Sequence, residues 1–296
     1  MGPLLFLIYI NDLSKLIESG DNILFADDVT HLDWSEDFNE VRNRINISLN
    51  SIAEWFLANK LCINIIKSEA MVFTRRNLYF PLPPLTLFNN PLPYNFYFKF
   101  LGLHLDFKLS WDTHLNKIRS KLSSACGILF SIRNKLTRSV ARLIYLSLCL
   151  PYLQYCNVIW ASCSPSKLQS ILNCQKKLIR LILKKGRREA SSPLYKKLKL
   201  LKLHDINDLN SVSFVFKSIN ELIPSPIHFA HQALGPYNLR RNDPLIVPFA
   251  RSRQAQRFIS IRGAKIWNNL PLDIRTCRTI HSIKKKLKLH YLTNYV

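Results

Sequence analysis

An α+β fold in two parts is the class that this 296-residue sequence predicts. Three observations indicate it: short β-prone runs are confined to the first 111 residues, helical periodicity dominates residues 112–296, and the net charge changes sign between the two parts. Hydrophobic residues make up 48% of the chain and charged residues 21%, which is typical of a globular protein and excludes a disordered one. Because this length suits about two domains, we expect them at 1–111 and 112–296.

The first part begins with a predicted hairpin. Ile23–Phe25 and Val29–Leu32 are β-prone runs that flank Asp27-Asp28, a pair favoured in tight turns. A helix is expected over Ser35–Asn59, because apolar residues recur there at steps of three and four. Ser35 is a suitable N-cap for that helix.

The remainder of the first part is expected to alternate strands and loops. Cys62–Ile65 and Ala70–Thr74 have the composition of strands. Residues 80–95 are rich in proline and asparagine, which is typical of a surface loop. Phe98–Phe107 is a strand region that contains Gly102.

The second part is expected to be mostly helical. One helix begins at Asp112 as its N-cap, another follows Ser164-Pro165, and a last amphipathic helix covers Ile280–Leu292. The uncharged stretch Leu143–Ser166 is long enough for a membrane span. Its proline and polar residues favour a buried helix, a turn and a second helix instead. Residues 237–262, which include Arg240-Arg241, are expected to be irregular.

Charge is divided unevenly between the two parts. Residues 1–111 hold 9 Lys/Arg and 12 Asp/Glu, a net charge of −3, whereas residues 112–296 hold 33 Lys/Arg and 7 Asp/Glu, a net charge of +26. The strongly positive charge of residues 112–296 implies a polyanionic partner. The residues expected to contact nucleic-acid phosphates lie on the helix after Pro165 and in the basic run behind it: Lys176, Lys177, Arg180, Lys184, Lys185, Arg187 and Arg188. Three tryptophans are candidates for base stacking or for the core, and the sequence leaves both open: Trp111, Trp160 and Trp267.

The seven cysteines form no CxxC pair and have no Cys/His spacing suited to zinc. Their odd number and apolar surroundings indicate reduced core thiols in an intracellular protein, with nucleus and cytoplasm not distinguished by the sequence. The apolar start, Met1–Ile10, lacks the basic beginning and the cleavage site of a signal peptide. No membrane partner is expected.

Two adjacent carboxylates at the tip of the predicted hairpin are the sharpest chemical feature. Nucleotidyl transfer by two metal ions needs carboxylates that bridge the ions and leave positions open for substrate phosphates. Asp27 and Asp28 suit that role, because a hairpin turn holds them beyond its strands. Aspartate is also a common turn residue, so a purely structural pair is the alternative.

The motifs around this pair follow in a recognisable order. The run Gly2–Leu13 (GPLLFLIYINDL) precedes Phe25-Ala26-Asp27-Asp28 after a short spacer. Behind them come Trp55, Asn59–Leu61, Asn64, Lys67-Ser68 and Met71–Phe73, then Phe100–Gly102, Leu109–Trp111 and His114, and finally Ala264–Pro271 with Ile274-Arg275. This order and spacing resemble those of the reverse transcriptases of non-LTR retrotransposons (LINE elements, jockey-like), over nearly the whole chain.

The resemblance implies a fold and an activity. Residues 1–111 would form a partial polymerase palm, a β-hairpin with helices, and residues 112–296 a mostly helical thumb and carboxy-terminal region that binds nucleic acid. The implied activity of the parent enzyme is RNA-directed DNA synthesis by two-metal nucleotidyl transfer with Mg²⁺. Its implied partners are an RNA template and a DNA primer.

The resemblance also implies roles for individual residues. Asp27 and Asp28 match the hairpin metal ligands. Lys67 matches a candidate proton donor to the pyrophosphate leaving group, with a solvated lysine in a turn as the alternative. Leu101 and Gly102 match the segment that brings the backbone close to the primer, which glycine permits.

The family pattern also has, ahead of Gly2-Pro3, a strand carboxylate and a fingers region that have no counterpart in this sequence. Asp12, Asp33 and Asp106 do not stand in a matching context. We therefore expect a chain truncated within the palm and inactive alone, with the missing amino-terminal part of the polymerase as a partner. The alternative is a non-catalytic nucleic-acid-binding protein derived from a truncated retroelement.

Overall fold

The computed structural model describes residues 1–16, 19–74, 82–231 and 245–295. Its backbone divides into two compact units: unit 1 is Met1–Lys99 with Asp106–Leu109, and unit 2 is Phe100–Leu105 with Ser110–Val296. The described residues form helices and three two-stranded sheets, a mixture compatible with the predicted α+β class. The assignment of residues 1–111 to a palm and of 112–296 to a thumb stays a prediction.

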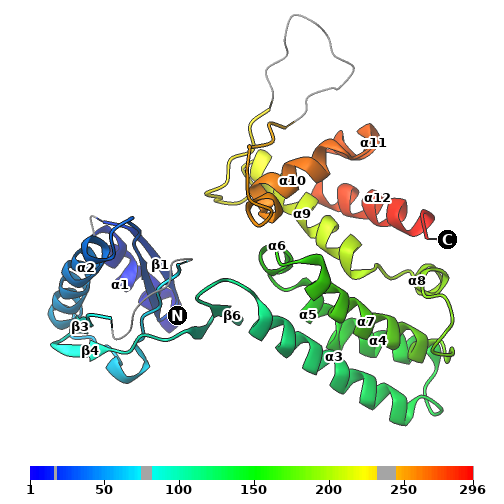
Figure 1. Cartoon of the computed structure of the whole chain (residues 1–296), viewed down its shortest axis with the longest axis horizontal. Coiled ribbons are helices and arrows are strands. Elements are labelled where there is room, and N and C mark those ends of the chain that lie inside the picture. Colours follow the sequence, from blue (N-terminus) through cyan, green and yellow to red (C-terminus); the bar gives the residue numbers. More distant parts are fainter. Residues whose placement is uncertain (17–18, 75–81, 232–244, 296) are drawn as a thin grey trace, which may run out of the picture. The chain divides into compact units, whose positions relative to one another are not determined.

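Unit 1 opens with a helix and a hairpin (Figure 1). Its first elements are α1 (Gly2–Ile10), the 3₁₀ turn η1 (Asn11–Lys15), β1 (Asp21–Phe25), β2 (Asp28–Leu32), α2 (Phe38–Ala58) and the 3₁₀ turn η2 (Ile65–Lys67). Strands β1 and β2 pair antiparallel, with Phe25 opposite Asp28, so the predicted tight hairpin is confirmed. Ala26 and Asp27 form its two-residue loop, and Ala26 adopts a positive φ of 53°.

Helix α2 is confirmed, but its predicted cap is wrong. The helix begins at Phe38, and Asp37 is the N-cap, whose carboxylate accepts a hydrogen bond from the Asn39 N–H at 3.0 Å. The Ser35 hydroxyl instead accepts the Asp37 N–H and donates to Glu40. Serine and aspartate are both good capping residues, so the choice between them depended on where the chain leaves β2.

Three expectations for residues 62–95 are wrong. Cys62–Ile65 and Ala70–Thr74 are not strands: the first segment leads into η2, and the second contributes only a bridge between Ala70 and Tyr94. Within the described part of 80–95, the expected loop is a hairpin of β3 (Leu85–Leu87) and β4 (Asn90–Leu92). Its leucines are buried against α2, and this tertiary burial outweighs the loop-like composition.

The predicted strand region 98–107 is a second hairpin. Strands β5 (Tyr97–Phe100) and β6 (Leu103–Asp106) form a two-stranded sheet. Leu101 and Gly102 make the turn with positive φ values of 45° and 86°. Glycine is suited to this turn because it adopts positive φ without strain.

Unit 2 is built from helices, as expected. They are α3 (Asp112–Ile132), α4 (Arg138–Leu148), α5 (Leu150–Gln154), α6 (Asn157–Trp160), α7 (Pro165–Ile182), α8 (Ser192–Leu198), α9 (Leu203–Ile219), the 3₁₀ turn η3 (Ala255–Arg257), α10 (Ile259–Asn268), α11 (Leu272–Arg275) and α12 (Ile280–Thr293). The N-cap of α3 is Trp111 and not Asp112, which is the first helical residue. Of the stretch expected to be irregular, 245–262 contains η3 and the start of α10, while 237–244, with Arg240-Arg241, lies outside the described residues.

The core of unit 2 has two centres. Helices α3 and α7 lie side by side (Figure 1) and bury Leu122, Leu129, Ile171 and Leu178 almost completely. Helices α9, α10 and α12 enclose a second cluster that includes Val212, Val215, Ala264, Ile283 and Leu287. Trp111, Trp160 and Trp267 are 0–6% exposed, so they are core residues and not stacking platforms in this structure.

The uncharged stretch Leu143–Ser166 spans the end of α4, the short helices α5 and α6, and the start of α7. Across the described part of the chain, no helix combines the length and the apolar composition needed to cross a membrane. All seven cysteines are free thiols. The prediction that they are core residues is confirmed only for Cys149, Cys163 and Cys174, because Cys62 is exposed and the other three are half-buried.

Candidate metal and nucleic-acid sites

The hairpin of β1 and β2 presents both of its tip carboxylates to solvent. Asp27 lies in the loop and Asp28 is the first residue of β2, and both are exposed. Beneath the tip, Leu24 and Val29 pack against a cluster formed by Ile10, Leu13 and α2. The apolar face of the hairpin is therefore anchored, while its acidic end is exposed.

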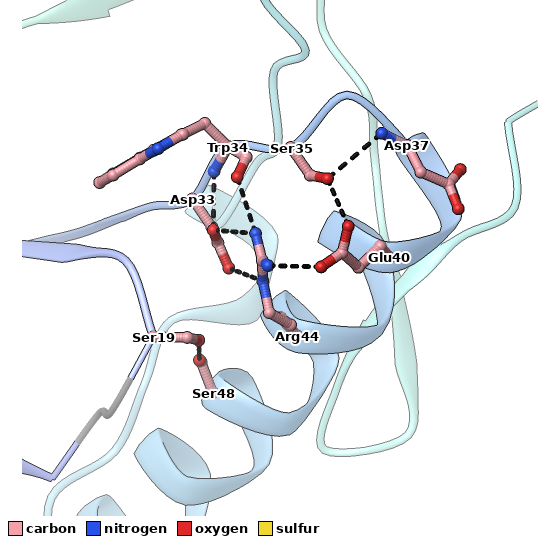
Figure 2. A network of polar contacts seen from close by, with 8 residues as sticks. All are labelled: Ser19, Asp33, Trp34, Ser35, Asp37, Glu40, Arg44 and Ser48. Carbon is pink, nitrogen blue, oxygen red and sulfur yellow. Dashed lines mark hydrogen bonds and ion pairs between the residues drawn. The ribbon is translucent and has the colours of Figure 1, made fainter.

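A polar clamp fixes the other end of β2 to α2 (Figure 2). The Arg44 guanidinium donates from Nε and Nη2 to the two carboxylate oxygens of Asp33, at 2.9 and 2.7 Å, and from Nη2 to the Trp34 carbonyl at 2.7 Å. Arg44 Nη1 also reaches Glu40 at 2.8 Å, one helical turn earlier. Burial opposes ionisation of Asp33, but the hydrogen bonds from Arg44 hold the pKa of its carboxyl below the ordinary value. Sequence reasoning missed this clamp, whose only local signal is the spacing of Glu40 and Arg44.

Asp27 and Asp28 fit a magnesium ion as a partial ligand set. Carboxylate oxygens are ligands that Mg²⁺ prefers, and the ion is often held by one or two carboxylates, with water and substrate phosphates completing its octahedron. Both side chains are exposed and neither makes a hydrogen bond or ion pair within the described part of the chain. Asp33 is committed to Arg44, and no cluster of three or more His, Cys, Asp or Glu suited to a metal is found among the described residues.

Lys67 is exposed at the end of η2. Asn64 caps this turn, and its side-chain oxygen accepts the Lys67 N–H at 3.2 Å. Where the chain is described, no hydrogen bond or ion pair joins Lys67 to Asp27 or Asp28. The two parts of the predicted catalytic set are thus both displayed, but no contact brings them together.

Leu101, which is half-buried, and Gly102, which is exposed, form a turn that contacts Tyr155. The Tyr155 hydroxyl donates a hydrogen bond of 2.5 Å to the Leu101 carbonyl. A side chain at Gly102 would meet the Tyr155 ring at 3.4 Å, an ordinary contact, so the positive φ and not crowding favours glycine here.

The predicted basic residues differ in what they do. Arg180 Nε donates to the Glu189 carbonyl at 3.0 Å, and Lys185 pairs with the Glu189 carboxylate at 3.0 Å. These two cations therefore hold the turn that follows α7. Lys176 is half-buried, and the remaining members of the set are exposed: Lys177, Lys184, Arg187 and Arg188.

Comparisons with known proteins relate the chain to two polymerases of mobile elements. Over 189 residues it is 30% identical to a protein of Drosophila melanogaster described as a probable RNA-directed DNA polymerase from transposon X-element. Over 192 residues it is 24% identical to the RNA-directed DNA polymerase from mobile element jockey of Drosophila funebris. Each match covers 62% of this chain and 21% of the relative, so the chain spans about a fifth of the length of these relatives.

No family model and no solved structure matches the chain. The resemblance drawn from the motifs is nevertheless confirmed by the two sequence matches, which point to the same kind of element. By sequence, the chain is related to the RNA-directed DNA polymerases of jockey-like non-LTR retrotransposons.

Proposed function

We propose that this chain is part of an RNA-directed DNA polymerase of a mobile element, in which Asp27 and Asp28 hold Mg²⁺. The observation that carries the proposal is the anchored hairpin with two adjacent, exposed carboxylates, in a chain similar to such polymerases. Within the described residues, neither carboxylate makes a hydrogen bond or an ion pair. Residues 1–111 would belong to the palm, and residues 112–296 to a thumb and carboxy-terminal region.

In this proposal the bound magnesium would neutralise charge on the substrate phosphates. Asp27 and Asp28 supply its carboxylate oxygens, and the clamp between Arg44 and Asp33 keeps β2 in place so that these oxygens are displayed together. Lys67 would give a proton to the pyrophosphate that leaves.

The turn at Leu101 and Gly102 would lie against the primer. A two-metal site needs more oxygen ligands than two carboxylates supply. We therefore expect the isolated chain to be inactive until a further polypeptide segment completes the site. Separately, we expect the protein to work inside the cell.

The test is a chimera in which this chain follows the amino-terminal part of the X-element polymerase. We expect Mg²⁺-dependent incorporation of deoxynucleotides on a primed RNA template, and Asp27→Asn to abolish it. Asp21→Asn is the matched control, since Asp21 is an exposed aspartate at the opposite end of the same hairpin. Lys67→Ala should cost on the order of 10²- to 10⁴-fold, less than the loss of a metal ligand. Equal effects of Asp27→Asn and Asp21→Asn would contradict the assignment, and so would a larger effect of Lys67→Ala.

A second candidate is a non-catalytic nucleic-acid-binding protein, favoured by the net charge of +26 on residues 112–296, which hold 33 Lys/Arg and 7 Asp/Glu. The same chimera distinguishes the two. Tight binding of the primed template, unchanged by Asp27→Asn and without any incorporation, would favour the non-catalytic function.

A further inference from the structure

A basic pocket lies in unit 2 where the first turn of α4 meets the last turn of α8; both helices are labelled in Figure 1. It has a volume of about 490 Å³, which is within the range of ligand sites. Its lining consists of Arg138, Ser139, Arg142, Lys197, Leu198 and Lys199. Four of these six residues are cations.

The base of the pocket is held by packing and a hydrogen bond, and its opening is surrounded by long, exposed side chains. Arg142 Nε donates to the Leu198 carbonyl at 2.9 Å, which joins α4 to the end of α8. Leu198 is 3% exposed and closes the base. Arg138, Lys197 and Lys199 are exposed and surround the opening with long side chains that can adjust to a ligand.

The positive charge of the pocket is not neutralised from within. Its lining contains no acidic residue, and the first turn of α4 contains none either. Across the described residues, none of its four cations forms an ion pair with an acidic side chain. Lys288 on α12 adds to the charge: burial lowers the pKa of its ammonium, and the nearby positive charges of Arg142 and Lys199 lower it further. Cations gathered in this way repel one another, and a bound anion relieves that repulsion.

We propose that this pocket binds consecutive phosphate groups of a nucleic-acid strand. Guanidinium forks and ammonium groups are the side chains that proteins use for phosphate. The lining includes no aromatic ring on which a base could stack, so the contacts are to the backbone and independent of sequence. The choice of a strand rests on the proposed function, since a small polyphosphate would present the same chemistry.

The first measurement uses the full chain and a fluorescein-labelled 20-nucleotide oligo(dT) between about 50 and 200 mM salt. The variant Arg138→Gln/Lys197→Gln/Lys199→Gln removes the rim of the pocket but keeps Arg142, whose hydrogen bond is structural. Each lost contact should lower the slope of log affinity against log salt by about 0.7. We expect the slope to fall by about 2 and the affinity near 100 mM salt to fall by at least ~10-fold more than in the control.

The control is Lys117→Gln/Arg119→Gln/Lys121→Gln. These three cations are exposed on α3, and their loss changes the net charge by the same amount. Equal losses in the two triple variants would show that only overall charge matters and would overturn the proposed site.

Binding of inorganic pyrophosphate, measured by titration calorimetry, separates failure of the pocket from failure of the proposed function. We expect the wild-type chain to bind both oligo(dT) and pyrophosphate, and the pocket variant to be weakened for both. Pyrophosphate binding without oligo(dT) binding would overturn the strand as the occupant and contradict the proposed function. Oligo(dT) binding that the pocket variant leaves unchanged would overturn the pocket alone.

Discussion

Replacing Gln175 by leucine should lower the free energy of unfolding of unit 2 by about 3–9 kcal/mol. Gln175 lies on α7 and is 0% exposed. Its Nε2 donates to the Tyr145 hydroxyl at 2.8 Å and to the Leu201 carbonyl at 3.0 Å, and its Oε1 accepts the Leu203 N–H at 2.9 Å. One amide thus joins α7 to α4 and to the chain that leads into α9.

The magnitude follows from what the substitution leaves behind. Leucine is close to glutamine in size, so the packing of the surrounding side chains is largely kept. Three buried polar groups, on Tyr145, Leu201 and Leu203, lose their partner, and each costs about 1–3 kcal/mol. Tyr145→Phe is the matched comparison, because it deletes only one of the three hydrogen bonds and should cost about 1 kcal/mol.

Urea unfolding followed by circular dichroism of the helices measures both variants. The midpoint should fall while the slope of free energy against urea stays constant, since the surface exposed on unfolding is unchanged. A loss below about 1 kcal/mol for Gln175→Leu would refute the reasoning. A loss as large for Tyr145→Phe as for Gln175→Leu would equally show that the other two hydrogen bonds contribute nothing.

Three further predictions concern backbone, charge and thiols. Gly102→Ala should destabilise the chain by about 1 kcal/mol because the backbone φ there is +86°. Gly127→Ala should stabilise it by about 0.5–1 kcal/mol, because Gly127 lies inside α3 with open space around it. Thermal unfolding compares the two variants, and a change in stability of the same sign in both would contradict the strain argument. Burial raises the pKa of Asp208 to about 6, so the folded state favours the protonated carboxyl. The stability that this group contributes should be complete below about pH 4 and should be lost as the pH rises to about 6. Asp208→Asn should remove this pH dependence, and urea unfolding across that pH range tests it. Iodoacetamide should modify the exposed Cys62 long before the buried Cys149, because burial raises the pKa of the Cys149 thiol to about 12. Mass spectrometry of the peptide that is labelled first tests this order.

The sequence predicted correctly those helices and strands that are specified by neighbouring residues. The hairpin of β1 and β2 needs only two β-prone runs and a turn pair between them, and all of these are contiguous. Helix α7 follows from one apolar stripe and a Ser-Pro start. The hairpin of β3 and β4 was missed because its three buried leucines are stabilised by α2, about 30 residues earlier, and not by their own neighbours.

The candidate sites divide in the same way. The exposure of Asp27 and Asp28 at the hairpin tip was predictable, because it follows from their place in a tight turn, while their role as metal ligands stays a prediction. The pairing of Asp33 with Arg44 was not, since the two are 11 residues apart on different elements. Nor could composition distinguish Arg180, which donates to the Glu189 carbonyl, from exposed cations such as Arg187.

A charged side chain that already pairs within the fold is poorly placed to bind a ligand. Within each unit, this distinguishes charges that stabilise the fold from charges that are candidates for binding. In unit 1, Asp33 pairs with Arg44, so its loss should loosen β2. The Asp27 side chain is exposed and makes no hydrogen bond or ion pair within the described residues, so its replacement by asparagine should leave folding intact. In unit 2, Arg180 holds the turn after α7, while Arg187 is exposed. Substitutions of the committed charges should therefore change stability without changing the salt dependence of binding, and substitutions of the free charges should do the reverse. This opposition allows a binding defect to be attributed to lost contacts with phosphate and not to a damaged fold.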